Sequence, residues 1–426
     1  MERGEQRYLT YLEILRRELV PAMGCTEPVA LAYCAAKARE LLGTLPDRVE
    51  VEASGNIIKN VKSVIVPNTD GRKGIEAAAA IGVLAGDASR ELEALSQVTQ
   101  EQKEALGPYM ERTSFQVTPA DSDLVLDIRV RVFQGTRQAE ARIVHHHINV
   151  VYLACDGQVL LDKPLDEHPA EGSVDYGLLS VAGICDFADT VDLEDVRDIL
   201  DRQIAYNTVV SDEGLRGNYG ANIGKVLLDA YGRDIRTRAK ARAAAGSDAR
   251  MNGCELPVII NSGSGNQGMT TSLPVIEYAK ELGASQEKLY RALTLSNLLA
   301  IHEKTGIGAL SAYCGAVSAG AAAGAGIAYL NGGGLDAVSH TIINALAVTS
   351  GIVCDGAKAS CAAKIAAAVD AGILGYEMHI RGQHFDGGDG IVSRGVEETI
   401  RNVGLLGKEG MRETDKEILT IMTCFD

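Results

Sequence analysis

The run "ALSAYCGAVSAGAAAGAGIAYL", residues 309–330, has no charged side chain and consists mainly of alanine, glycine and serine. It lies in an uncharged segment, between Lys304 and Asp336, that is long enough to cross a bilayer. Small residues gain little from lipid, but they let helix backbones approach one another closely. We therefore expect a helix buried in a tightly packed bundle rather than a membrane span, and no membrane partner.

The sequence around this run changes character along the chain. After about Val191 it continues in helical runs rich in alanine, glycine and leucine, broken by glycine loops. Residues 44–200 instead contain short β-like runs, and residues 126–132 alternate as in a half-buried strand. The chain is predicted to be α+β overall, with an N-terminal α/β domain that carries a mixed sheet (1–200) and a tightly packed all-helical catalytic domain (201–426).

The β-like runs include "KSVIVP" at residues 62–67 and a longer run at residues 139–157, which contains three adjacent histidines, "HHH". Alternate residues of a strand face opposite sides, so the three histidines cannot all converge on one metal ion. A single histidine, His147, is the one we expect to reach an active site.

The segment "PAMGCTEP", residues 21–28, interrupts a helical N-terminus. Leucines at the spacing of an amphipathic helix predict a helix over residues 5–20, and Pro21 ends it. Helical composition resumes after this segment, with Thr26 as the expected N-cap. Cys25 therefore belongs to a loop at the start of a helix.

Charge and composition narrow the class of protein. The formal net charge of -16 argues against a nucleic-acid partner, because a phosphate backbone requires clustered lysine and arginine. The N-terminal segment is charged and lacks the apolar centre of a secretory signal, so we expect a cytoplasmic protein. A small-molecule substrate fits this composition; the oligomeric state stays open, with a homodimer as the candidate.

Nine cysteines, an odd number, are scattered along a chain that is too large to need a disulfide framework. Cys314, Cys354 and Cys361 fall in the helical half, and the last two are seven residues apart in "CDGAKASC". An Asp-Gly turn lets these two converge, and Ser360 can cap the next helix. Three interpretations of these cysteines are open. They could be small buried side chains, or zinc ligands, although the paired C-x2-C motifs of structural zinc are missing from their spacing. They could also be the ligands of a 4Fe-4S cluster that leaves one iron open.

The glycine-rich stretch "INSGSGNQGMTTSLPV", residues 260–275, is either an ordinary turn or an anion site. Its backbone N–H groups can form a nest at the start of a helix that we expect from Met269. The side chains that could bind a substrate carboxylate there are Ser262, Ser264, Asn266 and Gln267.

The charged group "HEK", residues 302–304, precedes the uncharged run. Charged residues at a helix end are usually solvated, and this is the default interpretation. Lys304 is nevertheless a candidate to meet a substrate carboxylate.

Four stretches together resemble the L-cysteine desulfidase family of bacteria and archaea and, more distantly, the iron-sulfur L-serine dehydratases. They occur in the same order along nearly the whole chain and are "PAMGCTEPVALAY" (21–33), "SGSGNQG" (262–268), "IGALSAYCGAVSAGAAAGAGIAYL" (307–330) and "CDGAKASC" (354–361). The dehydratases space their last two cluster ligands further apart than seven residues. That difference favours the desulfidase branch.

The resemblance implies a 4Fe-4S enzyme that cleaves L-cysteine to pyruvate, ammonia and sulfide without pyridoxal phosphate. It makes Cys314, Cys354 and Cys361 the cluster ligands and Cys25 the proton acceptor. A helix N-terminus is expected to lower the pKa of the Cys25 thiol. The open iron would bind the substrate thiol, while the glycine nest, together with Lys304, would stabilise the carboxylate.

Rival functions stay open at this point. L-serine dehydratase differs only in the atom that meets the iron, and a catalytically silent iron-sulfur relative would share the scaffold. A pyridoxal-phosphate lyase is suggested by "SGNQG" and "LNGGGLDA", but Lys225 and Lys240 lack the setting of a Schiff-base lysine. Cys424, near the C-terminus, is a candidate to cap the open iron when substrate is absent.

Overall fold

The computed structural model describes residues 1–165, 174–308 and 310–423. Its strands are β1 (Pro21–Met23), β2 (Arg48–Ala53), β3 (Ser114–Pro119), β4 (Asp127–Gln134), β5 (Arg137–Val144), β6 (Val150–Cys155), β7 (Gln158–Asp162) and β8 (Pro257–Ile259). The helices of the first half are α1 (Gln6–Glu18), α2 (Thr26–Leu42), α3 (Gly55–Val61), α4 (Gly74–Ala85), η1 (Ala88–Glu93), α5 (Gln100–Arg112), η2 (Tyr176–Leu178) and α6 (Val181–Thr190). The remaining helices are α7 (Leu193–Arg216), α8 (Ile223–Tyr231), α9 (Ile235–Met251), α10 (Gly265–Glu281), α11 (Gln286–Thr305), α12 (Ala316–Leu330), α13 (Leu335–Thr349), α14 (Cys361–His379), α15 (Val396–Leu405), η3 (Leu406–Gly410) and α16 (Arg412–Thr423).

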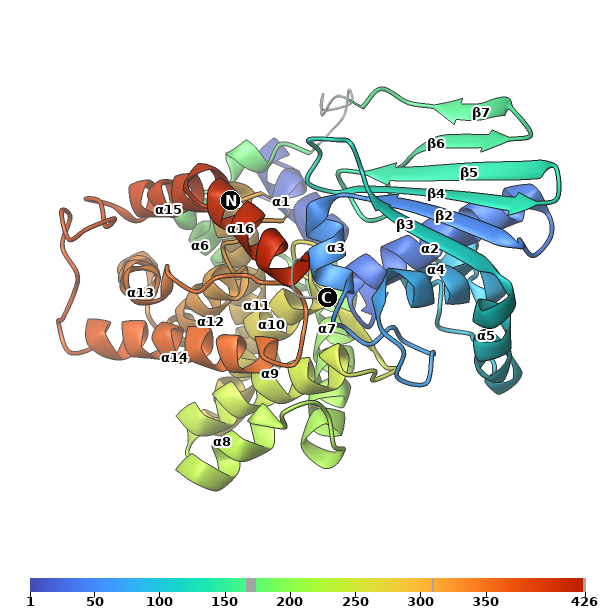
Figure 1. The fold of residues 1–426 in the computed structure, drawn as a ribbon. Coiled ribbons are helices and arrows are strands. Elements are labelled where there is room, and N and C mark those ends of the chain that lie inside the picture. Colours follow the sequence, from blue (N-terminus) through green and yellow to red (C-terminus); the bar gives the residue numbers. More distant parts are fainter. Residues whose placement is uncertain (166–173, 309, 424–426) are drawn as a thin grey trace.

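The fold is α+β, as predicted, and its sheet is mixed. The strand order is β3-β2-β4-β5-β6-β7, with β2 and β3 parallel and the other neighbours antiparallel. Helices α2 and α4 lie on one face of this sheet (Figure 1). The apolar residues of β2 and β4 are buried toward these helices.

The other face of the sheet carries a ladder of ion pairs. Arg131 of β4 pairs with Glu50 and Glu52 of β2, and Arg129 pairs with Glu140 of β5. Alternation of apolar and charged residues along a strand places the two kinds on opposite faces. This alternation explains why one sheet face is packed and the other is charged.

The uncharged run forms the centre of the helical half. Every residue of α12 is buried, and α10, α11, α13 and α14 pack around it. A Cβ added at Gly324 would lie 2.4 Å from the carbonyl oxygen of Gly372 in α14. The two backbones touch at this point, so only glycine allows the approach. In the part of the chain that the structure describes, no helix is long and apolar enough to cross a membrane.

Two N-terminal elements connect the halves of the molecule. Helix α1 packs against α7 and α11, so the first helix joins the core of the helical half. Strand β1 follows and pairs antiparallel with β8, which leads into the glycine-rich loop. The pairing fixes the start of α2, and with it Cys25, next to that loop.

Some local predictions were wrong. Residues 62–67 are not a strand; within them, Ile65 makes a single bridge to Lys73 after α3 ends at Val61. The three histidines lie in the loop between β5 and β6, where His145 has a φ of 65°. Helix α7 runs through residue 200, and the division into two domains there stays a prediction.

Candidate active site

Cys314 and Cys354 are brought together by a short antiparallel bridge. Tyr313 pairs with Val353, and the Cys354 N–H donates to the carbonyl of Ala312 at 2.6 Å. In such a pairing the residues that flank the bridged pair face the same side. The two thiols therefore share one face of the bridge.

Cys361 completes the group of three thiols. It is the first residue of α14, and its Sγ lies 3.7 Å from the carbonyl oxygen of Gly356. Burial and the charges of the neighbouring Cys354 and Cys361 raise the pKa of Cys314 to about 12. Ser360 takes the predicted N-cap position, although its hydroxyl makes no capping hydrogen bond.

The three thiols are donors of the kind that hold an iron-sulfur cluster. Within the described ranges, no three His, Cys, Asp or Glu side chains gather closely enough to ligate one common ion. A zinc ion requires such a gathering, with four ligands around one point. In an iron-sulfur cluster each thiolate binds a different iron, so the sulfurs are held apart. Three cysteine thiols are the type of donor that the second case requires.

The N-termini of four helices meet around these thiols. Cys25 is the N-cap of α2, Ser264 caps α10, Cys314 precedes the Gly315 cap of α12, and Cys361 begins α14. A Cβ at Gly315 would lie 2.8 Å from the side-chain amide carbon of Gln267 in α10, so α10 and α12 touch here. Cys361 packs against a small apolar cluster formed by Cys25, Val64 and Met251. Helix N-termini carry partial positive charge, so this junction favours anions.

Cys25 is buried and faces a carboxylate. Its Sγ–H donates to Glu27 Oε2 at 3.2 Å. Burial and the Glu27 charge raise the thiol pKa well above its usual value, although the charge of Arg250 opposes them. The predicted lowering of this pKa by the helix N-terminus is therefore wrong for the protein in this form, because burial and Glu27 outweigh the helix field.

Glu27 was not among the site residues predicted from the sequence, yet it contacts two of them, Cys25 and His147. Thr26 Oγ1 donates to Glu27 Oε2 at 2.9 Å, and Asn60 Nδ2 donates to Oε1 at 3.3 Å. His147 Nε2 forms an ion pair with Oε1 at 4.0 Å and has no hydrogen-bond partner among the described residues. Burial alone would raise the pKa of Glu27, but His147 and Cys25 outweigh it and lower the pKa to about 2.

His147 reaches this region from the β5–β6 loop, as expected for one histidine of the three. A Cβ at Gly263 would lie 3.2 Å from His147 Cε1, so the imidazole rests on the glycine-rich loop. The ring therefore lies between that loop and Glu27. His145 instead contacts the carbonyl of Leu165 at 2.7 Å.

The glycine-rich loop turns into α10 earlier than predicted. The helix begins at Gly265 rather than Met269, so Asn266 and Gln267 stand in its first turn. Ser262 has a φ of 49°, and its hydroxyl donates to Asn261 Oδ1 at 2.9 Å. Ser264 is the N-cap but makes no side-chain capping hydrogen bond. The first N–H groups of α10 and these side chains therefore line the same turn.

Glu303 and Lys304 are buried, so the solvated default for this pair was wrong. Lys304 is 6% exposed and lies near Cys354 and Cys314, and its burial lowers its pKa to about 8. Glu303 is 2% exposed, and neither of its carboxyl oxygens has a partner in the described part of the chain. The Lys304 ammonium is thus placed to offset negative charge on the thiols.

Arg250 is a second residue that the sequence-based site omits. It lies near the end of α9 and is 3% exposed. Its Nη1 donates to Asn266 Oδ1 at 3.1 Å. An arginine in the alanine-rich run "AKARAAAGSDARM" is the signal that could have found it, because a charge on a buried helix requires a partner.

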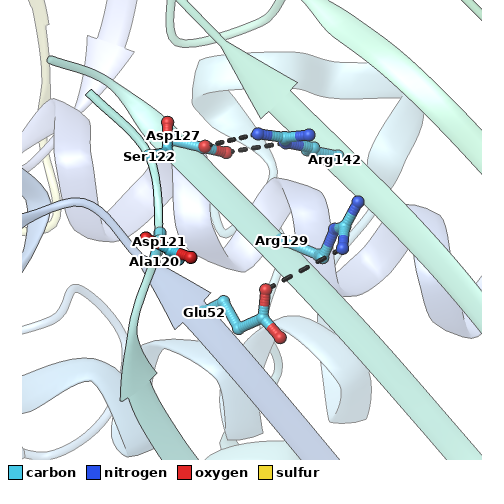
Figure 2. Close-up of a pocket in the computed structure, with 7 residues that line it drawn as sticks. All are labelled: Glu52, Ala120, Asp121, Ser122, Asp127, Arg129 and Arg142. Carbon is cyan, nitrogen blue, oxygen red and sulfur yellow. Dashed lines mark hydrogen bonds and ion pairs between the residues drawn. The ribbon is translucent and has the colours of Figure 1, made fainter. Parts of the chain in front are cut away.

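The pocket drawn in Figure 2 lies elsewhere, on the charged face of the sheet. It has a volume of about 200 Å³, and Glu52 and Arg129 of the ion-pair ladder line it. Arg142 and Asp127 form a two-pronged ion pair in it, with distances of 2.6 and 2.9 Å. Three carboxylates and two guanidiniums line it, and none of the candidate site residues does.

The sequence was compared with models of known protein families. Residues 89–420 match the model for the serine dehydratase alpha chain. The chain belongs to this family. The matched range includes the three clustered cysteines and the glycine-rich loop but not Cys25. The protein is therefore related to serine dehydratase, and the match does not single out the desulfidase branch.

Whole-chain relatives carry no activity in their names. A UPF0597 protein of Desulfitobacterium hafniense is 58% identical over 422 residues, covering 99% of this chain and 98% of the relative. UPF0597 proteins of Lachnoclostridium phytofermentans and Treponema denticola are 54% and 47% identical, over 97% and 99% of this chain and 99% of each relative. Such coverage means that the chain aligns with these relatives from end to end.

Proposed function

We propose that this protein is an iron-sulfur lyase that eliminates hydrosulfide from L-cysteine, with pyruvate and ammonia as the final products. One observation carries the proposal: three neighbouring thiols lie at a junction of helix N-termini, next to a thiol that is paired with a carboxylate. The family match supports the lyase class.

Cys314, Cys354 and Cys361 would hold a 4Fe-4S cluster through one sulfur each. The helix N-termini at Cys314 and Cys361 would stabilise the negative charge of their thiolates, and the buried Lys304 ammonium would add to this. When bound, the cluster supplies an open iron as a Lewis acid for the substituent on the substrate β-carbon. Cys424, the candidate cap for that iron, lies outside the residues that the structure describes.

Cys25 would remove the proton from the substrate α-carbon. Its thiol would first lose a proton to water as the substrate binds, and the thiolate, whose sulfur is positioned 3.2 Å from Glu27 Oε2, would then accept the α-proton. The electrons of the Cα–H bond form the Cα–Cβ double bond, and those of the Cβ–S bond leave with sulfur as hydrosulfide. The aminoacrylate that remains tautomerises and is hydrolysed by water to pyruvate and ammonia.

The turn at the start of α10 would bind the substrate carboxylate. Backbone N–H groups at a helix N-terminus are suited to an anion, and the turn carries four polar side chains, namely Ser262, Ser264, Asn266 and Gln267. Charge that develops at Cα during deprotonation spreads toward the carboxylate. Donors fixed in advance around that group therefore stabilise the transition state.

Anaerobic product analysis tests this function. Protein reconstituted with iron and sulfide should form pyruvate and sulfide in equal amounts from L-cysteine. Cys25→Ser should keep the iron but lose turnover, whereas Cys34→Ser, which alters another buried thiol, should keep both. Cys34 is a matched control because it is buried in the apolar core beside the sheet, where its Sγ donates to the backbone carbonyls of Ile128 and Ala141. Full activity in Cys25→Ser would exclude the assigned base.

Dehydration of L-serine is the second candidate, favoured by the name of the matching family. The same residues would act in it, with water rather than hydrosulfide as the leaving group. Pyruvate from L-serine, and none from L-cysteine, would replace the first candidate with this one.

A further inference from the structure

Arg250 carries a buried positive charge without a carboxylate partner in the described part of the chain. Its side chain is 3% exposed, and its Nε is buried without an acceptor. Its Nη1 donates a hydrogen bond to the neutral amide oxygen of Asn266 at 3.1 Å. Arg142 shows the contrast: it lies on the sheet and forms a two-pronged pair with Asp127.

Such a burial is costly unless an anion completes it. A charged group removed from water loses its solvation, and a single neutral acceptor returns only part of that loss. The planar guanidinium is shaped to bind a carboxylate through two parallel hydrogen bonds. The surroundings of Arg250 therefore point to a carboxylate that comes from outside the chain.

The position of the guanidinium indicates where that carboxylate binds. A Cβ added at Gly265 would lie 2.4 Å from Arg250 Nε and 2.9 Å from Cζ, so the side chain lies against the first residue of α10. Gln267, two residues further on, is 5% exposed, and its Oε1 is buried without a donor. One helix start thus holds an unsatisfied cationic donor and an unsatisfied acceptor, a pair that matches the carboxylate and ammonium of an α-amino acid.

We propose that Arg250 binds the α-carboxylate of the substrate at the N-terminus of α10, with the Gln267 amide oxygen accepting a hydrogen bond from the substrate ammonium. The amino-acid identity of the ligand rests on the proposed function. The need for a carboxylate rests on the environment of Arg250 alone. Arg250 is then the group that selects amino acids over amines and amides of the same shape.

Ligand-dependent thermal stabilisation of the full-length protein tests this assignment under anaerobic conditions. Stabilisation reports binding whether or not turnover follows. L-Cysteine and L-serine are compared with L-cysteinamide and L-serinamide, which lack the carboxylate charge. The wild-type protein should bind each acid about 10- to 100-fold more tightly than its amide, the range expected for hydrogen bonds to a charged group. Arg250→Gln should remove this preference, while the control Arg236→Gln, on the exposed side of the same helix, should keep it.

The outcomes separate this inference from the proposed function. A wild-type protein that binds amides as tightly as acids, or an Arg250→Gln variant that still prefers acids, overturns the role of Arg250. If Arg250→Gln loses the preference for acids and the wild-type protein forms no pyruvate, the result supports the role of Arg250 and excludes the proposed lyase activity. If Arg250→Gln does not fold, Arg250→Lys takes its place; it keeps the buried charge but not the two-pronged geometry, and a preference equal to that of wild type would overturn the role.

Discussion

Glu27→Gln removes the charge that faces the Cys25 thiol while leaving the shape of the side chain almost unchanged. Among the described residues, Glu27 Oε2 is the acceptor for the Cys25 Sγ–H, at 3.2 Å. A glutamine can still touch the thiol, but it lacks the carboxylate oxygen that accepts the Sγ–H and positions the sulfur. Misplacing a reacting group by about 1 Å costs about 100-fold in rate, so we expect kcat to fall by about 100-fold.

The same substitution has a calculable effect on stability. The pKa of Glu27 is lowered from 4.5 to about 2, which corresponds to about 3 kcal/mol in favour of the ionised form, at about 1.4 kcal/mol for each pKa unit. Because the folded pKa is the lower one, this contribution is complete above about pH 4.5 and is lost as the pH falls through about 2. Glu27→Gln should therefore lower the free energy of unfolding by up to about 3 kcal/mol at pH 7, and by about 1 kcal/mol less at pH 3.5.

The assay measures pyruvate formation, iron content and urea unfolding on the same anaerobic preparations. Iron content should not change, because Glu27 is not a proposed ligand. Glu40→Gln, on the exposed side of the same helix, should match wild type in all three measurements. A Glu27→Gln enzyme that keeps its kcat within about twofold would refute the positioning of the Cys25 sulfur by this carboxylate.

Three other substitutions test the packing and the charges. Burial raises the pKa of Asp248 to about 6, so the stabilising contribution of its protonated form is complete below about pH 3.8 and is lost as the pH rises through 6. Asp248→Asn should therefore raise the free energy of unfolding by about 1 to 3 kcal/mol at pH 7.5. An equal gain at pH 4 would contradict this. Gly324→Ala would press a methyl group against Gly372 and should lower urea-unfolding stability by about 1 to 3 kcal/mol, so an unchanged midpoint would argue against the close approach. Asp415→Asn breaks the pair with buried Lys59 and should speed trypsin cleavage within α16 several-fold, whereas an unchanged cleavage rate would mean that the pair does not hold this helix.

The helical core was open to prediction because its signal is compositional. A long uncharged run of small residues lets helices pack closely, so its composition indicates burial in a helix bundle. The sheet strands could likewise be predicted from the alternation of apolar and charged residues, since one sheet face is apolar and the other charged. The prediction of a strand over residues 62–67 was wrong because apolar side chains can be buried next to a helix end as well as in a sheet. A short apolar run does not distinguish the two.

The candidate site was predictable only in part. Cysteine spacing and the family resemblance pointed to three thiols that the structure brings together, and to Cys25 at a helix start. Glu27 and Arg250 were missed because their roles depend on the pairing of β1 with β8, two three-residue strands far apart in sequence. The state of the Cys25 thiol was also mispredicted, because the field of a helix can be read from sequence but the depth of burial and a facing carboxylate cannot.

Cluster analysis of the cysteine variants tests the central claim most directly. Wild-type protein, purified and reconstituted without oxygen, should contain about four iron and four sulfide per chain and show the visible absorption of a 4Fe-4S cluster. Serine in place of Cys314, Cys354 and Cys361 together should abolish that iron, while Cys34→Ser should retain it. A wild-type protein that takes up no iron, or a triple variant that keeps its cluster, would contradict the assignment of these three cysteines.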